Sequence, residues 1–269
     1  MPVNRVQEKI REIEHKERCS ILKIAVISDI HGNLPALEAV MSDIKKRKAD
    51  KIICLGDIVG KGPSSKEAID ICKKECDIVI KGNWEDFICK DYTALNQGKT
   101  DKISERIAWY INSIGDQRMK YLEALPHSTE FYFSGKLTRL FHAHPKNYNR
   151  YYQNSSLEQR LELFDFSDFS EEEKTADIAI YADIHSAYLQ AGQGRYLVNV
   201  GSVGNPLETT QASYVILEGE NDDPNFSVQF MRIAYDIEKA IELAKEANVP
   251  DLEGYISELR TAVYFKRSK

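Results

Sequence analysis

An apolar segment that stops at two metal-binding side chains restricts the fold of this sequence more than any other feature. Residues 24–27 are apolar, and Asp29 and His31 follow, two positions apart. Such a run is typical of a strand covered on both faces, and open α/β sheets bind ligands at the carboxyl ends of these strands. On an extended chain Asp29 and His31 point to the same side and can reach one cation. By itself, the pattern also occurs in ordinary turns between a strand and a helix.

The same arrangement occurs twice more along the chain. A second short strand, residues 51–55, precedes Asp57, and a third, residues 77–80, precedes Asn83. Helical patterns separate the three strands, which indicates parallel βαβ units. Consecutive units of this kind are right-handed and place their strand ends side by side. We therefore predict that Asp29, Asp57 and Asn83 converge at one edge of a sheet.

Strands predicted later in the chain end at further ligand types. His142 and His144 follow a predicted hairpin, and Asp183 and His185 follow a predicted strand. A mixed set of imidazole, carboxylate and amide groups suits manganese, iron or zinc better than magnesium or calcium. The predicted elements here are a hairpin over 131–141, a strand at 177–181, a hairpin over 188–199, strands at 214–217 and 226–233, and helices at 235–247 and 250–262.

Composition limits the classes of function. The chain has 269 residues, of which 42% are hydrophobic and 29% charged, enough for one substantial core. Its net charge of −6 argues against a dedicated nucleic-acid surface. No segment approaches 18 consecutive apolar residues, and the charged N-terminus lacks the apolar core of a signal peptide, so we expect a cytoplasmic protein. The five cysteines form no Cys-x-x-Cys pair and are interpreted as reduced core residues.

Five ordered blocks over about residues 23–206 carry a resemblance to a known family. Asp29-Ile30-His31, Gly56-Asp57, Gly82-Asn83-Trp84-Glu85, His142 and Asp183-Ile184-His185 stand in this order. The sequence resembles the calcineurin-like metallophosphoesterases, and within them the bacterial phosphodiesterase branch and its symmetrical diadenosine tetraphosphate hydrolases. The resemblance implies a four-layer α/β/β/α sandwich with mixed sheets over residues 21–269 and a small helical lobe at about 86–126. Residues 1–20 are predicted to be a helical arm, either solvated or frayed.

The resemblance also implies the roles of the site residues. Asp29, His31 and His185 would hold one metal, Asp57 would bridge two metals, and Asn83 and His142 would hold the second. Asp183 stands where the family usually has a histidine ligand. Asp57, Asn83 and Asn33 are the predicted catalytic residues, and Asn33, Trp84 and His144 are the predicted substrate contacts, with His144 outside the ligand set. Two metals about 3.5–4 Å apart can clamp a phosphoryl group and share a hydroxide that attacks in line.

Two departures from the family pattern bear on the substrate. Trp84 replaces a histidine, and indole cannot protonate a leaving group, which favours a phosphoanhydride or an activated ester over an alkyl monoester. Trp84 either stacks on a nucleobase or packs as a core or lid residue. Asp183 either ligates the second metal or marks the decay of that site. Tyr148, Tyr151 and Tyr152, among basic residues, form either a phosphate-contacting rim or an exposed aromatic surface.

The sequence therefore predicts a metal-dependent phosphoric ester or anhydride hydrolase with two transition metals. Manganese and iron are the favoured ions, with zinc as a further candidate. The expected partner is a small nucleotide-like substrate such as diadenosine tetraphosphate, with no membrane partner, and a homo-oligomer is compatible with the sequence. Two alternatives remain at this point: a scaffold of the same fold that has lost its activity, and a monoester or protein phosphatase.

Overall fold

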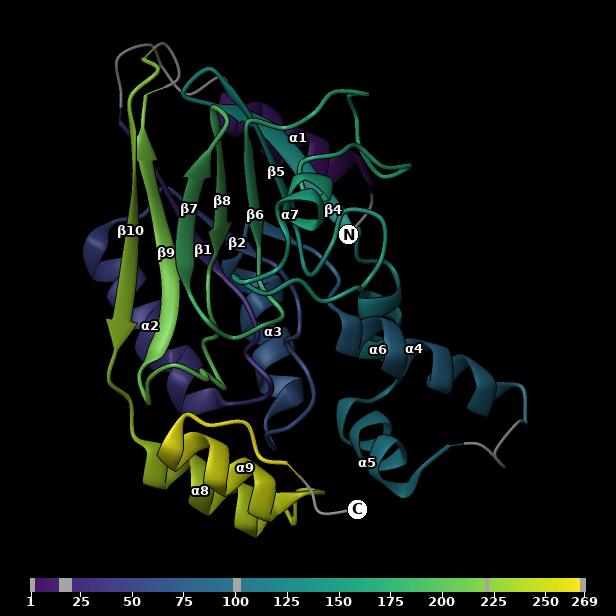
Figure 1. Ribbon diagram of the computed structural model, residues 1–269. Helices are drawn as coiled ribbons and strands as arrows, with labels where there is room; N and C mark the ends of the chain where they lie inside the picture. Colours follow the sequence, from purple (N-terminus) through teal and green to yellow (C-terminus); the bar gives the residue numbers. More distant parts are fainter. Residues whose placement is uncertain (1–2, 15–20, 99–102, 221–222, 267–269) are drawn as a thin grey trace.

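The computed structural model describes residues 3–14, 21–98, 103–220 and 223–266, and within them it contains two five-stranded sheets (Figure 1). The first sheet has the order β10-β9-β1-β2-β3. The neighbouring strands β1, β2 and β3 are parallel, as predicted. On the other side of β1, β9 pairs with it in an antiparallel manner, and β10 pairs with β9 in the same manner. These strands are β1 (Leu22–Ile27), β2 (Lys51–Cys54), β3 (Ile78–Val79), β9 (Ala212–Gly219) and β10 (Phe226–Ile233).

The second sheet has the order β4-β5-β6-β8-β7 and is also mixed. The pairs β4/β5 and β7/β8 are the two predicted hairpins, and β6 runs parallel to both β5 and β8. The strands are β4 (Ser128–Phe133), β5 (Lys136–Phe141), β6 (Ile178–Tyr181), β7 (Tyr188–Gly192) and β8 (Arg195–Asn199).

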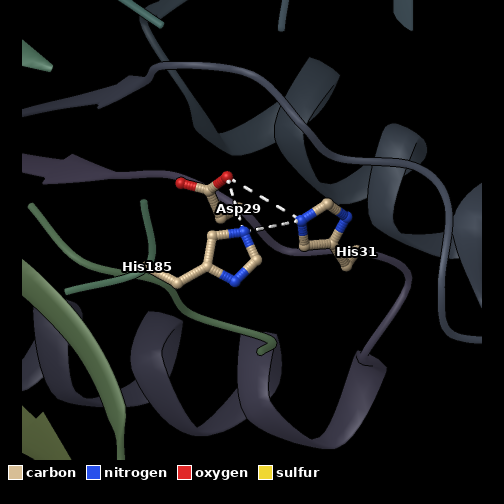
Figure 2. Close-up of side chains that lie close together, drawn as sticks. All are labelled: Asp29, His31 and His185. Carbon is tan, nitrogen blue, oxygen red and sulfur yellow. Dashed lines mark hydrogen bonds and ion pairs between the residues drawn. The ribbon is translucent and has the colours of Figure 1, made fainter. Parts of the chain in front are cut away.

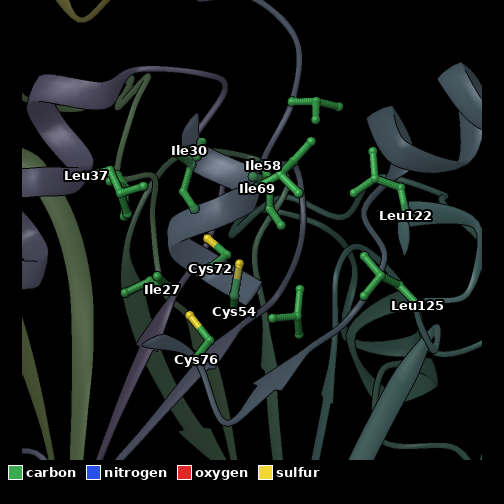
Figure 3. Packing of buried hydrophobic residues seen from close by; sticks show 14 of the residues in the cluster. Ile27, Ile30, Leu37, Cys54, Ile58, Ile69, Cys72, Cys76, Leu122 and Leu125 are labelled. Carbon is green, nitrogen blue, oxygen red and sulfur yellow. The ribbon is translucent and has the colours of Figure 1, made fainter. Parts of the chain in front are cut away.

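Successive side chains of β1 point into two different apolar cores, and this explains how the layers are held together. Ile24 and Val26 belong to the apolar core between the two sheets, whereas Ala25 and Ile27 face the core under the helices of the first sheet. Successive side chains of a strand point to opposite faces, so a strand covered on both faces reads as one continuous apolar run. Figure 3 shows the helix-side core, in which Cys54, Cys72 and Cys76 are buried as free thiols, as predicted.

Helices cover both outer faces, which confirms the predicted layered α/β architecture with two mixed sheets. The first sheet is covered by α2 (Leu34–Arg47) and α3 (Ser65–Glu75). The outer face of the second is covered by the segment that contains α7 (Leu157–Glu162) and by Leu163 and Phe164, which contact Phe141 and Tyr181 of β5 and β6. Among the described helices, none combines the length and hydropathy needed to cross a membrane.

Two groups of helices lie near the carboxyl ends of the parallel strands (Figure 1). The segment predicted as a small helical lobe at about 86–126 corresponds to three helices that pack on one another, and Gly115, at φ 81°, separates the last two. A second pair comes from the C-terminal part of the chain. The helices are α4 (Asn83–Asn96), α5 (Glu105–Ile114) and α6 (Asp116–Glu123), followed by the pair α8 (Ile237–Glu246) and α9 (Leu252–Thr261).

The N-terminal helix α1 (Val3–Glu14) differs from the solvated or frayed segment that we expected. Val6, Ile10 and Ile13 are buried in the core shared with the two sheets, and α1 packs beside β4. Their spacing places all three on one side of the helix, and that apolar stripe is covered by the sheet edge. The rest of the predicted arm, residues 1–2 and 15–20, lies outside the described residues.

Candidate metal centre

The predicted ligands lie in loops that leave the carboxyl ends of parallel strands. Asp29 and His31 follow β1, Asp57 follows β2, and Asn83 begins α4 directly after β3. His142 follows β5, and Asp183 and His185 follow β6 of the second sheet. The two sheets pack with these ends together, and the loops therefore meet.

The backbone of these loops is unusual at the ligand positions themselves. Asp29, His31, Asp57, Asp183 and His185 have φ values of 51°, 49°, 49°, 63° and 56°, in the left-handed region. Non-glycine residues rarely adopt this conformation, which costs about 1–3 kcal/mol and persists where the surrounding structure imposes it, often at functional sites. The tight turns bring side chains from both sheets to one point.

The first group of ligands consists of Asp29, His31 and His185 (Figure 2). The two Nε2 atoms are 3.1 Å apart, and Asp29 Oδ1 lies 3.3 Å from His185 Nε2 and 3.8 Å from His31 Nε2. Each ring has its other nitrogen beside a carbonyl: His31 Nδ1 is 3.1 Å from Val59 O, and His185 Nδ1 is 2.6 Å from Asn205 O. If each Nδ1–H donates to its carbonyl, both Nε2 lone pairs face the carboxylate, which is the orientation that a bound cation requires.

The second group consists of Asp29, Asp57 and His142, so Asp29 belongs to both. His142 Nε2 lies 3.4 Å from Asp57 Oδ2 and 3.9 Å from Asp29 Oδ1, and its Nδ1 faces Leu55 O at 2.9 Å. Asp57 Oδ2 is also 3.7 Å from His31 Nε2. The Asp57 carboxylate therefore lies between an imidazole of the first group and the imidazole of the second.

Buried polar atoms without a partner indicate that this cluster fits cations. Within the described residues, Asp29 Oδ1, His142 Nε2 and Asn83 Oδ1 are buried and accept or donate no hydrogen bond. Leaving such atoms unpaired in the interior costs about 1–3 kcal/mol each, and more for charged groups. Coordination to metal ions would satisfy Asp29 Oδ1 and His142 Nε2, which belong to the two ligand groups, and these donors are the nitrogen and oxygen types that transition metals accept.

Burial and neighbouring charges shift the pKa values of the cluster residues in different directions. Burial lowers the pKa of His31, helped by the neighbouring His185 ring, so His31 is held neutral. Burial raises the pKa of Asp57. Burial also opposes ionisation of Asp29, yet the imidazoles of His185 and His142 outweigh it and hold the pKa of this carboxyl well below its usual value. For His142 the carboxylates of Asp57 and Asp29 overcome burial and raise the pKa of the ring.

Glu85, which the sequence analysis did not assign a role, holds the Asp57 loop in place. Its buried carboxylate accepts hydrogen bonds from the backbone N–H groups of Asp57 (2.7 Å), Ile58 (2.8 Å), Val59 (3.1 Å) and Gly82 (2.8 Å). Burial and the Asp57 charge raise the pKa of Glu85 to about 7. Its position in the first turn of α4, three residues after the N-cap glycine, is the capping-box pattern that could have revealed this role.

Asn33 and His144 lie behind the cluster. Asn33 Oδ1 accepts from Ala36 N (3.2 Å) and caps α2, and Asn33 Nδ2 donates to Gly204 O (2.8 Å). His144 stacks on Tyr151, with ring centroids 5.1 Å apart, and faces the outer side of the second sheet. Neither residue lines the cavity described below. Their predicted roles at the substrate stay predictions.

Asp183 has a partner that the sequence did not predict. Its carboxylate is bound by the guanidinium of Arg150, and it belongs to neither group of candidate ligands. Asp183 Oδ1 lies 3.9 Å from His142 Nε2, so the ion pair borders the cluster directly.

A cavity of about 790 Å³ opens over the cluster. Trp84 lies in its wall: the Arg106 guanidinium sits 5.4 Å above the indole ring, and His31 and Tyr110 contact the ring edge-on. A Cβ atom added at Gly60 would fall 2.2 Å from an indole carbon, so the loop after β2 packs tightly on the ring. Of the two interpretations of Trp84, this geometry favours the packed one. The cavity is lined by His31, Asp57, Asp183 and His185, by the basic Lys61, Arg106, Arg150 and Lys266, and by the aromatic Trp84, Tyr110, Tyr152, Tyr255, Tyr264 and Phe265, among others.

A two-sheet sandwich with acid and imidazole side chains gathered at its strand ends is the arrangement expected of a metallophosphoesterase. Residues 22–222 match the model of the calcineurin-like phosphoesterase superfamily domain, and the chain belongs to this superfamily of phosphoric ester hydrolases. It is 31% identical over 252 residues to the "uncharacterized protein MJ0912" of Methanocaldococcus jannaschii, with coverage of 86% of this chain and 95% of that one.

Solved structures agree on the fold. A metallophosphoesterase from Sphaerobacter thermophilus superimposes with a TM-score of 0.69 at 24% identity, over 90% of this chain and 99% of that one. The hypothetical protein PH1004 from Pyrococcus horikoshii OT3 gives a TM-score of 0.68 at 19% identity, over 88% and 97%. The family match ends at residue 222, so the helices α8 and α9 that contribute Tyr255 to the cavity lie outside it.

Proposed function

We propose that this chain hydrolyses a nucleotide-type phosphodiester or phosphoanhydride with two transition-metal ions. Asp29, His31 and His185 would hold one ion, and Asn83 and His142 the other, with Asp57 between them. The position of Asp57 Oδ2, 3.7 Å from His31 Nε2 and 3.4 Å from His142 Nε2, is the observation that carries the proposal. A carboxylate placed between the imidazoles of two groups is suited to bridging two cations.

The ligand chemistry favours manganese or iron, with zinc as a further candidate, because imidazole nitrogen and carboxylate oxygen are both present. Such ions would polarise the phosphoryl oxygens and lower the pKa of a water that attacks in line. The contribution of the chain is to fix the donor atoms: Glu85 holds the Asp57 backbone, and Val59 O and Asn205 O orient the two imidazoles of the first group.

The side chains of the cavity wall favour an anhydride or a diester as the substrate over an alkyl monoester. Trp84 occupies the position at which the family has a histidine, and its indole N–H cannot protonate a leaving alkoxide. A leaving phosphate has a second pKa of about 6 and needs little protonation. A volume of about 790 Å³ is in the usual range of small-ligand sites. The wall contains four basic side chains, and two of them, Lys61 and Arg150, are paired with the acidic Glu258 and Asp183 of the same wall. Diadenosine tetraphosphate, cleaved symmetrically, is the specific substrate that we propose.

The test compares substrates on the purified, Mn²⁺-loaded protein. We expect bis-p-nitrophenyl phosphate to be cleaved faster than p-nitrophenyl phosphate, and diadenosine tetraphosphate to give ADP as the sole product. Asp57→Asn removes the proposed bridging charge and should reduce kcat by at least about a hundredfold. Asp116→Asn, at an exposed aspartate of α6, is the matched control and should leave kcat unchanged. A preference for the monoester would instead identify a monoester phosphatase, and no cleavage of any substrate would refute the proposal.

A further inference from the structure

The ion pair between Asp183 and Arg150 is the feature of the cavity that the proposed reaction does not explain. Arg150 Nε donates to Asp183 Oδ2 at 2.6 Å, and Arg150 Nη2 donates to Asp183 Oδ1 at 2.9 Å. The Asp183 side chain is 3% exposed, whereas that of Arg150 is 47% exposed. The pair thus has a buried acidic end next to the metal centre and a basic end that opens into the cavity.

This geometry is unfavourable for Asp183 as a metal ligand. Both of its carboxylate oxygens accept hydrogen bonds from the guanidinium, so a cation would have to displace Arg150 or share these oxygens with it. A metal ion at Asp183 would also lie beside the positive charge of the arginine. The Asp183–Arg150 pair is neutral as a whole, as is the histidine that the family usually has at this position, so the substitution leaves the net charge around the metals unaltered.

The cavity side of Arg150 is suited to binding phosphate. A guanidinium has five N–H donors in a planar fork, and Asp183 uses that of Nε and one of Nη2. Tyr152 is a further hydrogen-bond partner of this side chain. The donors that neither residue uses belong to a half-exposed side chain that lines the same cavity as His31, Asp57 and His185. Arginine binds phosphate oxygens through such forks, and a carboxylate behind it restricts the conformations of its long side chain.

We propose that Asp183 is a positioning residue that holds Arg150 at the metal centre as a phosphate-binding side chain, and that Asp183 is not itself a metal ligand. The proposal rests on the proposed function, since the bound group is a phosphate of that substrate. It assigns to Arg150 the recognition of substrate oxyanions. It leaves the second metal ion to Asp57, Asn83 and His142, beside the Asp29 carboxylate that both groups share.

The first test measures Mn²⁺ binding to the metal-free protein by calorimetry. Asp183→Asn should bind the same number of ions as the wild type, with each Kd within about threefold, whereas His142→Ala should lose one ion. Thermal unfolding by circular dichroism checks that each variant is folded. Loss of one ion in Asp183→Asn would show that Asp183 is a ligand and would overturn the proposal.

The second test measures binding of inorganic phosphate to the Mn²⁺-loaded protein. Arg150→Gln and Asp183→Asn should each raise the Kd by about ten- to a hundredfold, the effect of losing a charge-assisted contact with an anion. Because Asp183 acts through Arg150, the double variant should be no weaker than Arg150→Gln alone. In turnover, both single variants should raise KM more than they lower kcat, which a general structural defect would not do.

The surface pair Arg118 and Asp70 is the matched control. It has the same two-point geometry, with Arg118 Nε and Nη2 at 2.9 Å and 2.6 Å from the Asp70 carboxylate, and it does not line the cavity. Arg118→Gln should leave phosphate affinity unchanged. Equal phosphate affinity of Arg150→Gln and the wild type would overturn the proposal. A wild type without hydrolytic activity would refute the proposed function instead, because ion and phosphate binding are measured without turnover.

Discussion

Replacement of Glu85 tests how the fold maintains the Asp57 loop. Its carboxylate accepts four backbone hydrogen bonds, from Asp57, Ile58, Val59 and Gly82, and all of these groups are buried. Three of the donors belong to the loop after β2 and the fourth to the turn before α4. Glu85→Ala would therefore leave two loops of the metal centre without their shared acceptor.

The expected magnitude follows from the number of bonds. Hydrogen bonds to a charged group contribute about 1.5–3 kcal/mol each, so four contribute about 6–12 kcal/mol in gross terms. Burying the carboxylate opposes this gain, and burial together with the Asp57 charge raises the pKa of Glu85 to about 7. We expect Glu85→Ala to reduce the free energy of unfolding by roughly 3–5 kcal/mol, the loss typical of removing one partner from a buried charged network and a large part of the 5–15 kcal/mol typical of a folded protein.

Urea denaturation of the metal-free protein measures this loss. Glu85→Gln should reduce the free energy of unfolding less than Glu85→Ala does, because the amide keeps one acceptor oxygen and removes the buried charge. Glu246→Ala, at an exposed glutamate of α8, should change the free energy of unfolding by less than about 0.5 kcal/mol and serves as the control. A loss below about 1 kcal/mol in Glu85→Ala would refute the assigned role.

Three further predictions concern metal, the C-terminal helices and the second sheet. Chelation of the loaded protein should lower its Tm, since ions at a hundredfold excess over Kd stabilise the folded state by about 2.7 kcal/mol; an unchanged Tm would speak against a metal site. Glu258 of α9 accepts hydrogen bonds from Lys61 Nζ at 2.7 Å and Asn205 Nδ2 at 3.0 Å. Glu258→Gln should therefore reduce the free energy of unfolding in urea by about 1–3 kcal/mol. An unchanged free energy of unfolding would contradict this link between α9 and the site. Glu130 pairs with the fully buried Arg139, and Glu130→Ala should cost about 3–5 kcal/mol by thermal denaturation; a loss under 1 kcal/mol would contradict it.

The elements that the sequence predicted well depend on local patterns. The run at 24–27 reads as a strand because both of its faces are buried, and the hairpins follow from short loops that contain glycine. The burial of α1 is different: its apolar stripe is visible in the sequence, but the sheet edge that covers it is formed by β4, more than a hundred residues later. Sequence spacing shows that a helix has an apolar side, and only the assembled sheets show what covers it.

The same distinction applies to the site. The strand ends predicted that Asp29 and Asp57 lie together, because the neighbouring parallel strands β1 and β2 end at one edge. His142 and His185 join them from the ends of β5 and β6 in the second sheet. The predicted convergence of Asn83 with these residues stays a prediction. The partner of Asp183 could not be predicted, because Arg150 lies 33 positions away in a loop with no regular pattern. The capping of α2 by Asn33 was not predicted, because it depends on the orientation of the side chain at the start of the helix.

The central claim is that this cluster holds two metal ions with Asp57 between them. The most direct measurement is a crystal structure of the Mn²⁺-loaded protein with anomalous data at the manganese edge. The account predicts two anomalous peaks, one bound by Asp29, His31 and His185 and one by Asn83 and His142, with the Asp57 carboxylate bound to both. A single peak, no peak, or two peaks that Asp57 does not bridge would contradict it.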